Sequence, residues 1–177
     1  RKEAAALFQV EDPAQIVFTF NATHGLNLAI KTLVHPGHCV VISGYEHNAV
    51  TRPLYAIPEV EVRIAKSPLF CPEQAVQAFE RELEQGADVA ICTHVSNVFG
   101  FVLPIEEIAA LCCRYNIPLI VDASQSAGVL PIDLKTMDAA FIAMPGHKGL
   151  YGPQGTGLLL CNDKLPAPLL EGGTGSV

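Results

Sequence analysis

Hydrophobic residues occur in short runs separated by polar junctions, and this alternation predicts strands and helices in turn. Runs rich in β-branched and other apolar residues, which predict strands, lie at 16–20, 39–42, 89–92, 118–121, 138–143 and 156–161. Apolar and polar residues alternate at 60–64, which is typical of a half-buried edge strand. Amphipathic segments bounded by proline or glycine predict helices at 1–9, 21–33, 49–57, 73–85 and 104–115. Strands that alternate with helices indicate a three-layer α/β/α fold with a mostly parallel, seven-stranded sheet.

The organisation of the chain indicates one folded domain. A length of 177 residues is typical of a single domain, and no linker-like composition occurs before Pro166-Ala167-Pro168. We therefore predict a domain over residues 1–165 and a loop or linker over 166–177. The chain begins with Arg1 in a helix-like segment rather than with Met, so we expect a fragment of a longer protein.

Composition excludes several classes of partner. The formal net charge is −7, and no run of lysine or arginine offsets it, which argues against nucleic acid and anionic membranes. No apolar stretch approaches the roughly 18 residues that a membrane helix needs. The six cysteines form no CxxC pair, so a reducing, cytoplasmic location is the simplest expectation. The histidines and cysteines lack the spacing of a metal site, and none is predicted.

Polar side chains cluster where predicted strands end or helices begin. These clusters comprise Thr23-His24, Glu46-His47, Asn97, residues 122–125 and His147-Lys148. Because the carboxyl ends of parallel strands meet at one edge of a sheet, ligands collect there. The sequence therefore predicts an active site at this edge.

The residue types in these clusters favour particular roles, each with an ordinary alternative. Thr23 opens a helix, where backbone N–H groups suit a phosphate, or it is only the N-cap. Asp122 ends an apolar strand and needs a cationic partner such as a protonated ring nitrogen, or it caps the next turn. His47 stacks on a flat ligand or caps a helix.

Lys148 lies in a glycine-rich turn between two apolar runs. Apolar walls would favour its neutral amine, a nucleophile toward carbonyls; the alternative is a solvated surface lysine. A phosphate cradle, an acid for a ring nitrogen, a stacking imidazole and such a lysine together indicate a pyridoxal 5'-phosphate site with Lys148 as the Schiff-base lysine.

Six motifs in this order resemble those of the class V aminotransferases of pyridoxal phosphate fold type I, within the cysteine desulfurase and selenocysteine lyase group. They lie at 21–27, 46–48, 95–100, 122–128, 146–148 and 172–175. The resemblance covers nearly the whole chain and implies the large, cofactor-binding domain of such an enzyme.

The resemblance also implies a role for each matched residue. Phosphate binding is implied for Ala22, Thr23, His24 and His147, ring stacking for His47, protonation of the ring nitrogen for Asp122, and the Schiff base for Lys148. It implies contacts to the phenolic oxygen or the bound amino acid for Gln125 and Asn97, and contact with a neighbouring subunit's phosphate for Thr174, hence a homodimer.

The chain departs from the family pattern in two respects. Pro145 replaces the Ser or Thr that usually lies three residues before the lysine, and proline offers neither a hydroxyl nor an N–H group to a phosphate. The family's small domain, with its carboxylate-binding arginine and nucleophilic cysteine, lies outside the 177 residues. None of the six cysteines is therefore assigned a catalytic role.

These residues and the resemblance predict an enzyme acting on a small amino acid, of the type that removes sulfur from cysteine to give alanine, with a possible sulfur-acceptor protein. The first alternative is a class V aminotransferase or another amino-acid lyase. The second, motivated by Pro145 and the missing domain, is a truncated domain that folds without catalysing a reaction.

Overall fold

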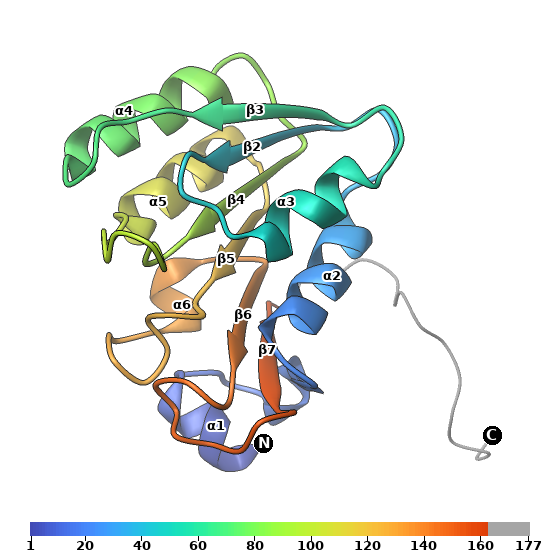
Figure 1. Cartoon of the computed structure of the whole chain (residues 1–177), viewed down its shortest axis with the longest axis vertical. Helices are drawn as coiled ribbons and strands as arrows, with labels where there is room; N and C mark the ends of the chain where they lie inside the picture. Colours follow the sequence, from blue (N-terminus) through green and yellow to red (C-terminus); the bar gives the residue numbers. More distant parts are fainter. Residues whose placement is uncertain (163–177) are drawn as a thin grey trace.

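A computed structural model describes residues 1–162, in which one seven-stranded sheet is covered by helices on both faces (Figure 1). The strand order is β1-β7-β6-β5-β4-β2-β3. Strands β3, β2, β4, β5 and β6 run parallel, whereas β7 is antiparallel to both β6 and β1. The strands are β1 (Ile16–Thr19), β2 (Cys39–Ser43), β3 (Glu61–Ala65), β4 (Val89–Thr93), β5 (Leu119–Asp122), β6 (Phe141–Pro145) and β7 (Gly157–Cys161). The predicted fold class and all seven strands are confirmed.

The helices also follow the prediction, with two additions. They are α1 (Lys2–Leu7), the 3-10 helix η1 (Pro13–Gln15), α2 (Ala22–Leu33), α3 (Asn48–Tyr55), α4 (Pro72–Leu83), α5 (Ile105–Tyr115) and α6 (Leu134–Met137). The pattern of apolar residues did not predict η1 or α6, which span three and four residues. Each is instead begun by a local cap: the Asp133 carboxylate accepts hydrogen bonds from the backbone N–H groups of Lys135 and Thr136.

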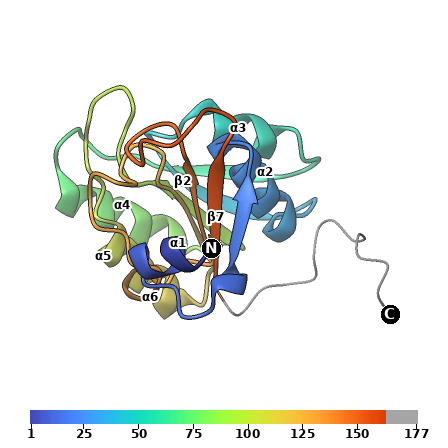
Figure 2. The ribbon, with the colours of Figure 1, turned by 90° about the horizontal axis from the view of Figure 1, so that it is seen from below.

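Two hydrophobic cores lie on opposite faces of the sheet. Helices α2 and α3 cover one face, while α1, α4, α5 and α6 lie on the other (Figure 2). Strand β5 shows the division, because Ile120 packs into the α2 side and Leu119 and Val121 into the opposite side. Its continuous apolar sequence follows from burial on both faces. Strand β3 forms one edge of the sheet, as its half-polar alternation predicted.

No helix within residues 1–162 has the length and apolar character needed to cross a membrane. The predicted loop or linker at 166–177, and the boundary at residue 165, lie outside the described residues.

Candidate active site

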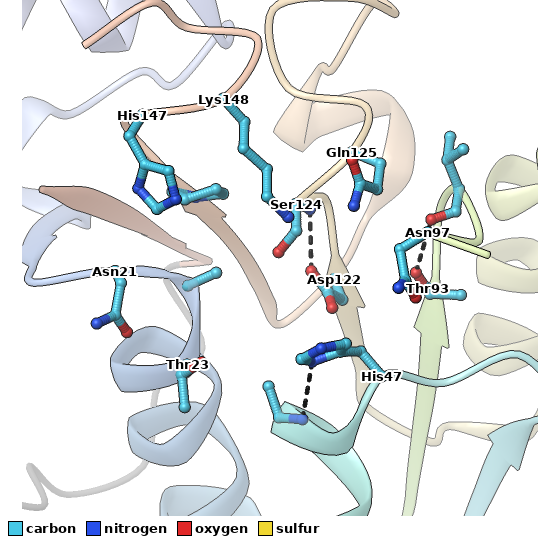
Figure 3. A pocket seen from close by; sticks show the side chains of 14 residues that line it. Asn21, Thr23, His47, Thr93, Asn97, Asp122, Ser124, Gln125, His147 and Lys148 are labelled. Carbon is cyan, nitrogen blue, oxygen red and sulfur yellow. Dashed lines mark hydrogen bonds between the residues drawn. The ribbon is translucent and has the colours of Figure 1, made fainter. Parts of the chain in front are cut away.

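A pocket of about 170 Å³ lies at the carboxyl ends of β4, β5 and β6, between the starts of α2 and α3 (Figure 3). It is lined by eight of the predicted site residues: Ala22, Thr23, His47, Asn97, Asp122, Gln125, His147 and Lys148. These residues are far apart in the sequence but lie close together because the parallel strands all end at the same edge of the sheet.

The start of α2 presents free donors to the pocket. Asn21 is the N-cap, since its side-chain oxygen accepts a 2.8 Å hydrogen bond from the backbone N–H of His24, so the alternative in which Thr23 is the cap does not hold. The backbone N–H groups of Ala22 and Thr23 have no partner within residues 1–162. A helix N-terminus with two free N–H groups and a neighbouring hydroxyl suits an anion such as phosphate.

His24 does not reach this pocket. Its backbone N–H is used by Asn21, and its ring stacks on Phe20 with 4.9 Å between centroids. Its Nδ1 accepts a hydrogen bond from the Phe20 N–H at 3.3 Å. The predicted phosphate contact from His24 therefore finds no support in the geometry, because both its backbone and its ring serve the local turn.

Asp122 lies at the bottom of the pocket, at the end of β5, and is 3% exposed. Its Oδ1 accepts a 2.9 Å hydrogen bond from the Ser124 N–H, so the carboxylate does cap the next turn. Because the residue also lines the pocket, the capping role and the predicted cofactor role are compatible. A carboxylate held this way is available to a cationic group of a ligand.

His47 caps a helix, which is one of the two alternatives predicted for it, and it also lines the pocket. It is the N-cap of α3, and its Nδ1 accepts a 3.0 Å hydrogen bond from the Ala49 N–H. In the neutral ring the proton then lies on Nε2. The imidazole points into the pocket from the α3 side (Figure 3).

Lys148 lies on the loop between β6 and β7, whose position is set by direct contact between backbones. A Cβ atom at Gly128 would lie 2.2 Å from the carbonyl oxygen of Gly149, and one at Gly149 would lie 2.3 Å from that of Ala127. Within the loop, the Gly152 N–H donates to the Gly146 carbonyl at 2.7 Å. Only glycine permits such close approach, so these residues hold the lysine-bearing backbone against the turn after Asp122.

The Lys148 side chain points toward the centre of the pocket, where Asp122 and Ser124 lie (Figure 3). Its Nζ makes no ion pair or hydrogen bond within residues 1–162. The residue is exposed, so the expectation that apolar walls enclose the amine is not met by the described part of the chain.

The remaining predicted residues lie around the rim. Asn97, Gln125 and His147 line the pocket and make no side-chain hydrogen bond within residues 1–162. Thr174 lies outside the described residues.

Several lining residues had no role assigned to them from the sequence, among them Asn21, Thr93 and Ser124. Ser124 had a usable signal, because it lies between two predicted residues in the turn after β5. Pro145 also lines the pocket, so the departure from the family pattern faces the site directly and offers no donor there.

The donor set matches the groups of pyridoxal phosphate. Free N–H groups, the Thr23 hydroxyl and the His147 ring suit the phosphate, and Asp122 suits a protonated ring nitrogen. Gln125 suits the phenolic oxygen, and Lys148 suits the aldehyde. Unpaired polar groups gathered in one pocket are typical of a ligand site, since proteins otherwise pair such groups internally.

Comparison with known proteins agrees with this assignment. A family model described as aminotransferase class-V matches residues 1–177. A probable cysteine desulfurase of Methanothermobacter thermautotrophicus is 32% identical over 97% of the chain, which spans 44% of that relative's length.

Solved structures with a similar fold include a cysteine desulfurase and a cystine C-S lyase. The apo structure of a cysteine desulfurase from Thermococcus onnurineus NA1 has a TM-score of 0.85 at 28% identity, over 98% of this chain and 45% of that one. The cystine C-S lyase C-DES, in complex with its reaction product cysteine persulfide, has a TM-score of 0.83 at 29% identity, over 92% of this chain and 45% of that one. A variant of C-DES carries glycine covalently linked to its pyridoxal phosphate cofactor, with a TM-score of 0.80 at 27% identity, over 92% of this chain and 44% of that one.

Proposed function

The chain belongs to the aminotransferase class-V family, and on that premise we propose that it is the cofactor-binding domain of a pyridoxal phosphate enzyme of cysteine desulfurase type. Such an enzyme removes sulfur from cysteine and leaves alanine. The observation that carries the proposal is the gathering of unpaired polar groups around Lys148 and Asp122 at one edge of the sheet. The likeness to desulfurases in sequence and in fold supports the substrate class.

In this proposal the start of α2 binds the phosphate through the N–H groups of Ala22 and Thr23, with His147 on the other side. The Asp122 carboxylate would hold the proton on the ring nitrogen, and His47, which lines the same pocket, would stack on the ring. When bound, the cofactor supplies a carbonyl for amines and an electron sink for the substrate. Lys148 would hold the cofactor through that carbonyl, and its amine would move the proton at the α carbon of the amino acid.

Gln125 and Asn97 complete the proposed site on the side away from α2 (Figure 3). Gln125 orients the phenolic oxygen by donating a hydrogen bond, and Asn97 contacts the bound amino acid. None of the six cysteines lines the pocket, so the thiol that accepts sulfur comes from outside the described residues.

The assembly and location follow from the same reasoning. We infer a homodimer in which the loop with Thr174 approaches the partner's phosphate site, and a protein that accepts the released sulfur. All six cysteines are free, which supports a cytoplasmic, reducing compartment. Because the chain spans 44% of its curated relative, the complete enzyme includes further sequence in this proposal.

Turnover of cysteine tests the proposal. The complete enzyme with pyridoxal phosphate and dithiothreitol should release sulfide and alanine in equal amounts, and Lys148→Ala should lower the rate by at least about a hundredfold because proton transfer loses its base. Lys66→Ala, a change at another exposed lysine that does not line the pocket, is the matched control. Equal rates in the two variants would contradict the proposal.

A second candidate is a cystine C-S lyase, favoured by the likeness to C-DES. The two reactions differ in their products, since a lyase leaves pyruvate and ammonia whereas a desulfurase leaves alanine. Measuring pyruvate and alanine in the same reaction separates them. A keto acid formed only with an amino acceptor would instead indicate an aminotransferase.

A further inference from the structure

Glu46 lies directly before His47 in the junction between β2 and α3, and one of its carboxyl oxygens joins two strands. Oε1 accepts a 2.5 Å hydrogen bond from the Ser43 hydroxyl and a 2.7 Å hydrogen bond from the Thr93 N–H. Ser43 in turn accepts a 3.1 Å hydrogen bond from the Tyr45 N–H. Glu46 therefore ties the carboxyl end of β2 to the carboxyl end of β4.

The second carboxyl oxygen is in a different position. Oε2 is buried and has no hydrogen-bond partner within residues 1–162. A carboxylate spreads its charge over both oxygens, so a buried oxygen without a donor is costly for the ionised form. A neutral acid with its carbonyl at Oε1 and its proton on Oε2 keeps both observed hydrogen bonds and avoids the buried charge.

The surroundings favour the same protonation state. Burial raises the pKa of Glu46 to about 8, and the charge of Asp122 acts in the same direction, while the hydrogen bonds from Ser43 and Thr93 oppose it. The titratable groups on the surrounding elements include Tyr45 and His47 on either side of Glu46, Cys92 and His94 on either side of Thr93, and Asp122 on β5.

Glu46 is linked to two residues that line the pocket, to Thr93 by a hydrogen bond and to His47 as its neighbour in the chain. Thr93 is the register partner of Asp122 across β4 and β5, and both line the pocket. His47 follows Glu46 in sequence and points into the same space. A negative charge on Glu46 would compete with Asp122 for the single positive charge expected of a ring nitrogen.

We propose that Glu46 is a positioning residue of this site, a neutral carboxylic acid that fixes His47 relative to Asp122 and leaves the negative charge of the pocket floor to Asp122. Its effect on the cofactor rests on the proposed function, whereas its protonation state is a property of the protein alone.

The neutral acid predicts how stability depends on pH. The pKa of Glu46 is raised from 4.5 in the unfolded reference to about 8 in the folded protein, so the folded state binds the proton more tightly. The contribution of Glu46 to stability therefore falls as the pH rises from 4.5 toward 8 and levels off above that value. Glu46→Gln removes this ionisation while retaining an oxygen at the Oε1 position.

The test compares Glu46→Gln, Glu46→Ala and the control Glu59→Gln, which changes an exposed glutamate outside the pocket. Thermal unfolding without cofactor is followed across this pH range, and pyridoxal phosphate affinity is measured by absorbance titration near pH 7. We expect the melting temperature of Glu46→Gln to decline less with pH than that of wild type or Glu59→Gln. Its Kd should stay within about twofold of wild type, whereas Glu46→Ala should weaken binding by about tenfold or more.

Two outcomes of the affinity measurements on the Glu46 variants would overturn the inference. The first is a Glu46→Gln variant that loses cofactor affinity as Glu46→Ala does, because the site would then need the charge. The second is a Glu46→Ala variant that binds as wild type does. If Glu46→Ala fails to fold, Ser43→Ala removes the 2.5 Å hydrogen bond to Glu46, together with the 3.1 Å hydrogen bond from the Tyr45 N–H, and should weaken binding several-fold; an unchanged Kd then contradicts the positioning role.

Failure of the proposed function gives a different result. In that case wild type itself does not bind pyridoxal phosphate, while the pH dependence of unfolding still reports whether Glu46 is neutral. A Glu46→Gln variant whose stability declines with pH as wild type does would overturn the inference whether or not the cofactor binds.

Discussion

Polar groups are paired differently at the two ends of the parallel strands, the amino edge of the sheet where these strands begin and the carboxyl edge where they end. At the amino edge they are paired within the protein: Asp88 accepts a 2.8 Å hydrogen bond from the Cys39 N–H, and Lys135 lies 2.9 Å from Glu11. Arg63, on β3, donates to the Gly86 carbonyl and to Cys39 Sγ. At the carboxyl edge, Gln125 and Lys148 have no such partners within residues 1–162.

The difference separates stabilising groups from ligand-binding groups. Pairing within the protein means that a polar side chain contributes to folding, whereas an unpaired side chain in a pocket leaves its hydrogen bonds for a ligand. Changes at the amino edge should therefore alter stability, and changes at the carboxyl edge should alter binding. Glu46, at the carboxyl edge, combines the two states, because one of its carboxyl oxygens is paired within the protein and the other has no partner within residues 1–162.

The largest effect is expected where the carboxyl edge is held by close backbone contact. Gly128→Ala places a Cβ atom 2.2 Å from the Gly149 carbonyl oxygen, so the lysine-bearing loop must move. We expect a loss of about 3 kcal/mol or more in unfolding free energy, together with weaker cofactor binding. Chemical denaturation and absorbance titration measure the two effects.

Gly155→Ala is the matched control for this change. Gly155 has the same φ of +79° as Gly128, but no atom lies within 4 Å of its would-be Cβ. Gly155→Ala should lower the unfolding free energy only by the conformational cost of about 1 kcal/mol, and the variant should keep its affinity for the cofactor. Equal losses in the two variants would show that backbone conformation, rather than contact between the two turns, governs the loop.

A smaller effect is expected from two single changes, one at each edge, which test directly whether the two edges differ. Arg63→Ala removes a largely buried side chain with internal partners, and should cost about 1–3 kcal/mol of stability while leaving the Kd for pyridoxal phosphate unchanged. Gln125→Ala should leave stability nearly unchanged and weaken binding by roughly fivefold to tenfold. Thermal unfolding and cofactor titration of both variants give the four values needed.

The proposed difference between the two edges is wrong if both variants alter stability or both alter cofactor affinity. A Gln125→Ala variant that unfolds as readily as Arg63→Ala, with unchanged affinity, would mean that the carboxyl edge is structural. An Arg63→Ala variant that loses cofactor affinity would mean that the two edges are coupled through β3 and β2.

The sequence predicted the strands and the polar clusters because both depend on local pattern. Leu119, Ile120 and Val121 form an uninterrupted apolar run, which indicates a strand buried on both faces, and Asp122 marks where that strand ends. Because ligands bind where parallel strands end, the sequence also predicted that His47 and Lys148 share one pocket, although the paths of the loops between them were not known.

Features that depend on the local backbone conformation or on partners distant in the sequence could not be predicted from the sequence. Asn21 and Thr23 are both good N-cap residues, and only the extended backbone at Asn21 decides between them. The burial of Glu46 depends on Thr93, which is 47 residues away along the chain. The exposure of Lys148 likewise follows from the path of its loop rather than from the apolar runs beside it.

The central claim is that the carboxyl edge holds pyridoxal phosphate on Lys148. The most direct measurement adds the cofactor, reduces the complex with borohydride and locates the retained mass on proteolytic peptides. We predict one stable label, on the peptide containing Lys148, and its loss in Lys148→Ala but not in Lys66→Ala. A label on another lysine, or none in wild type, would contradict the account.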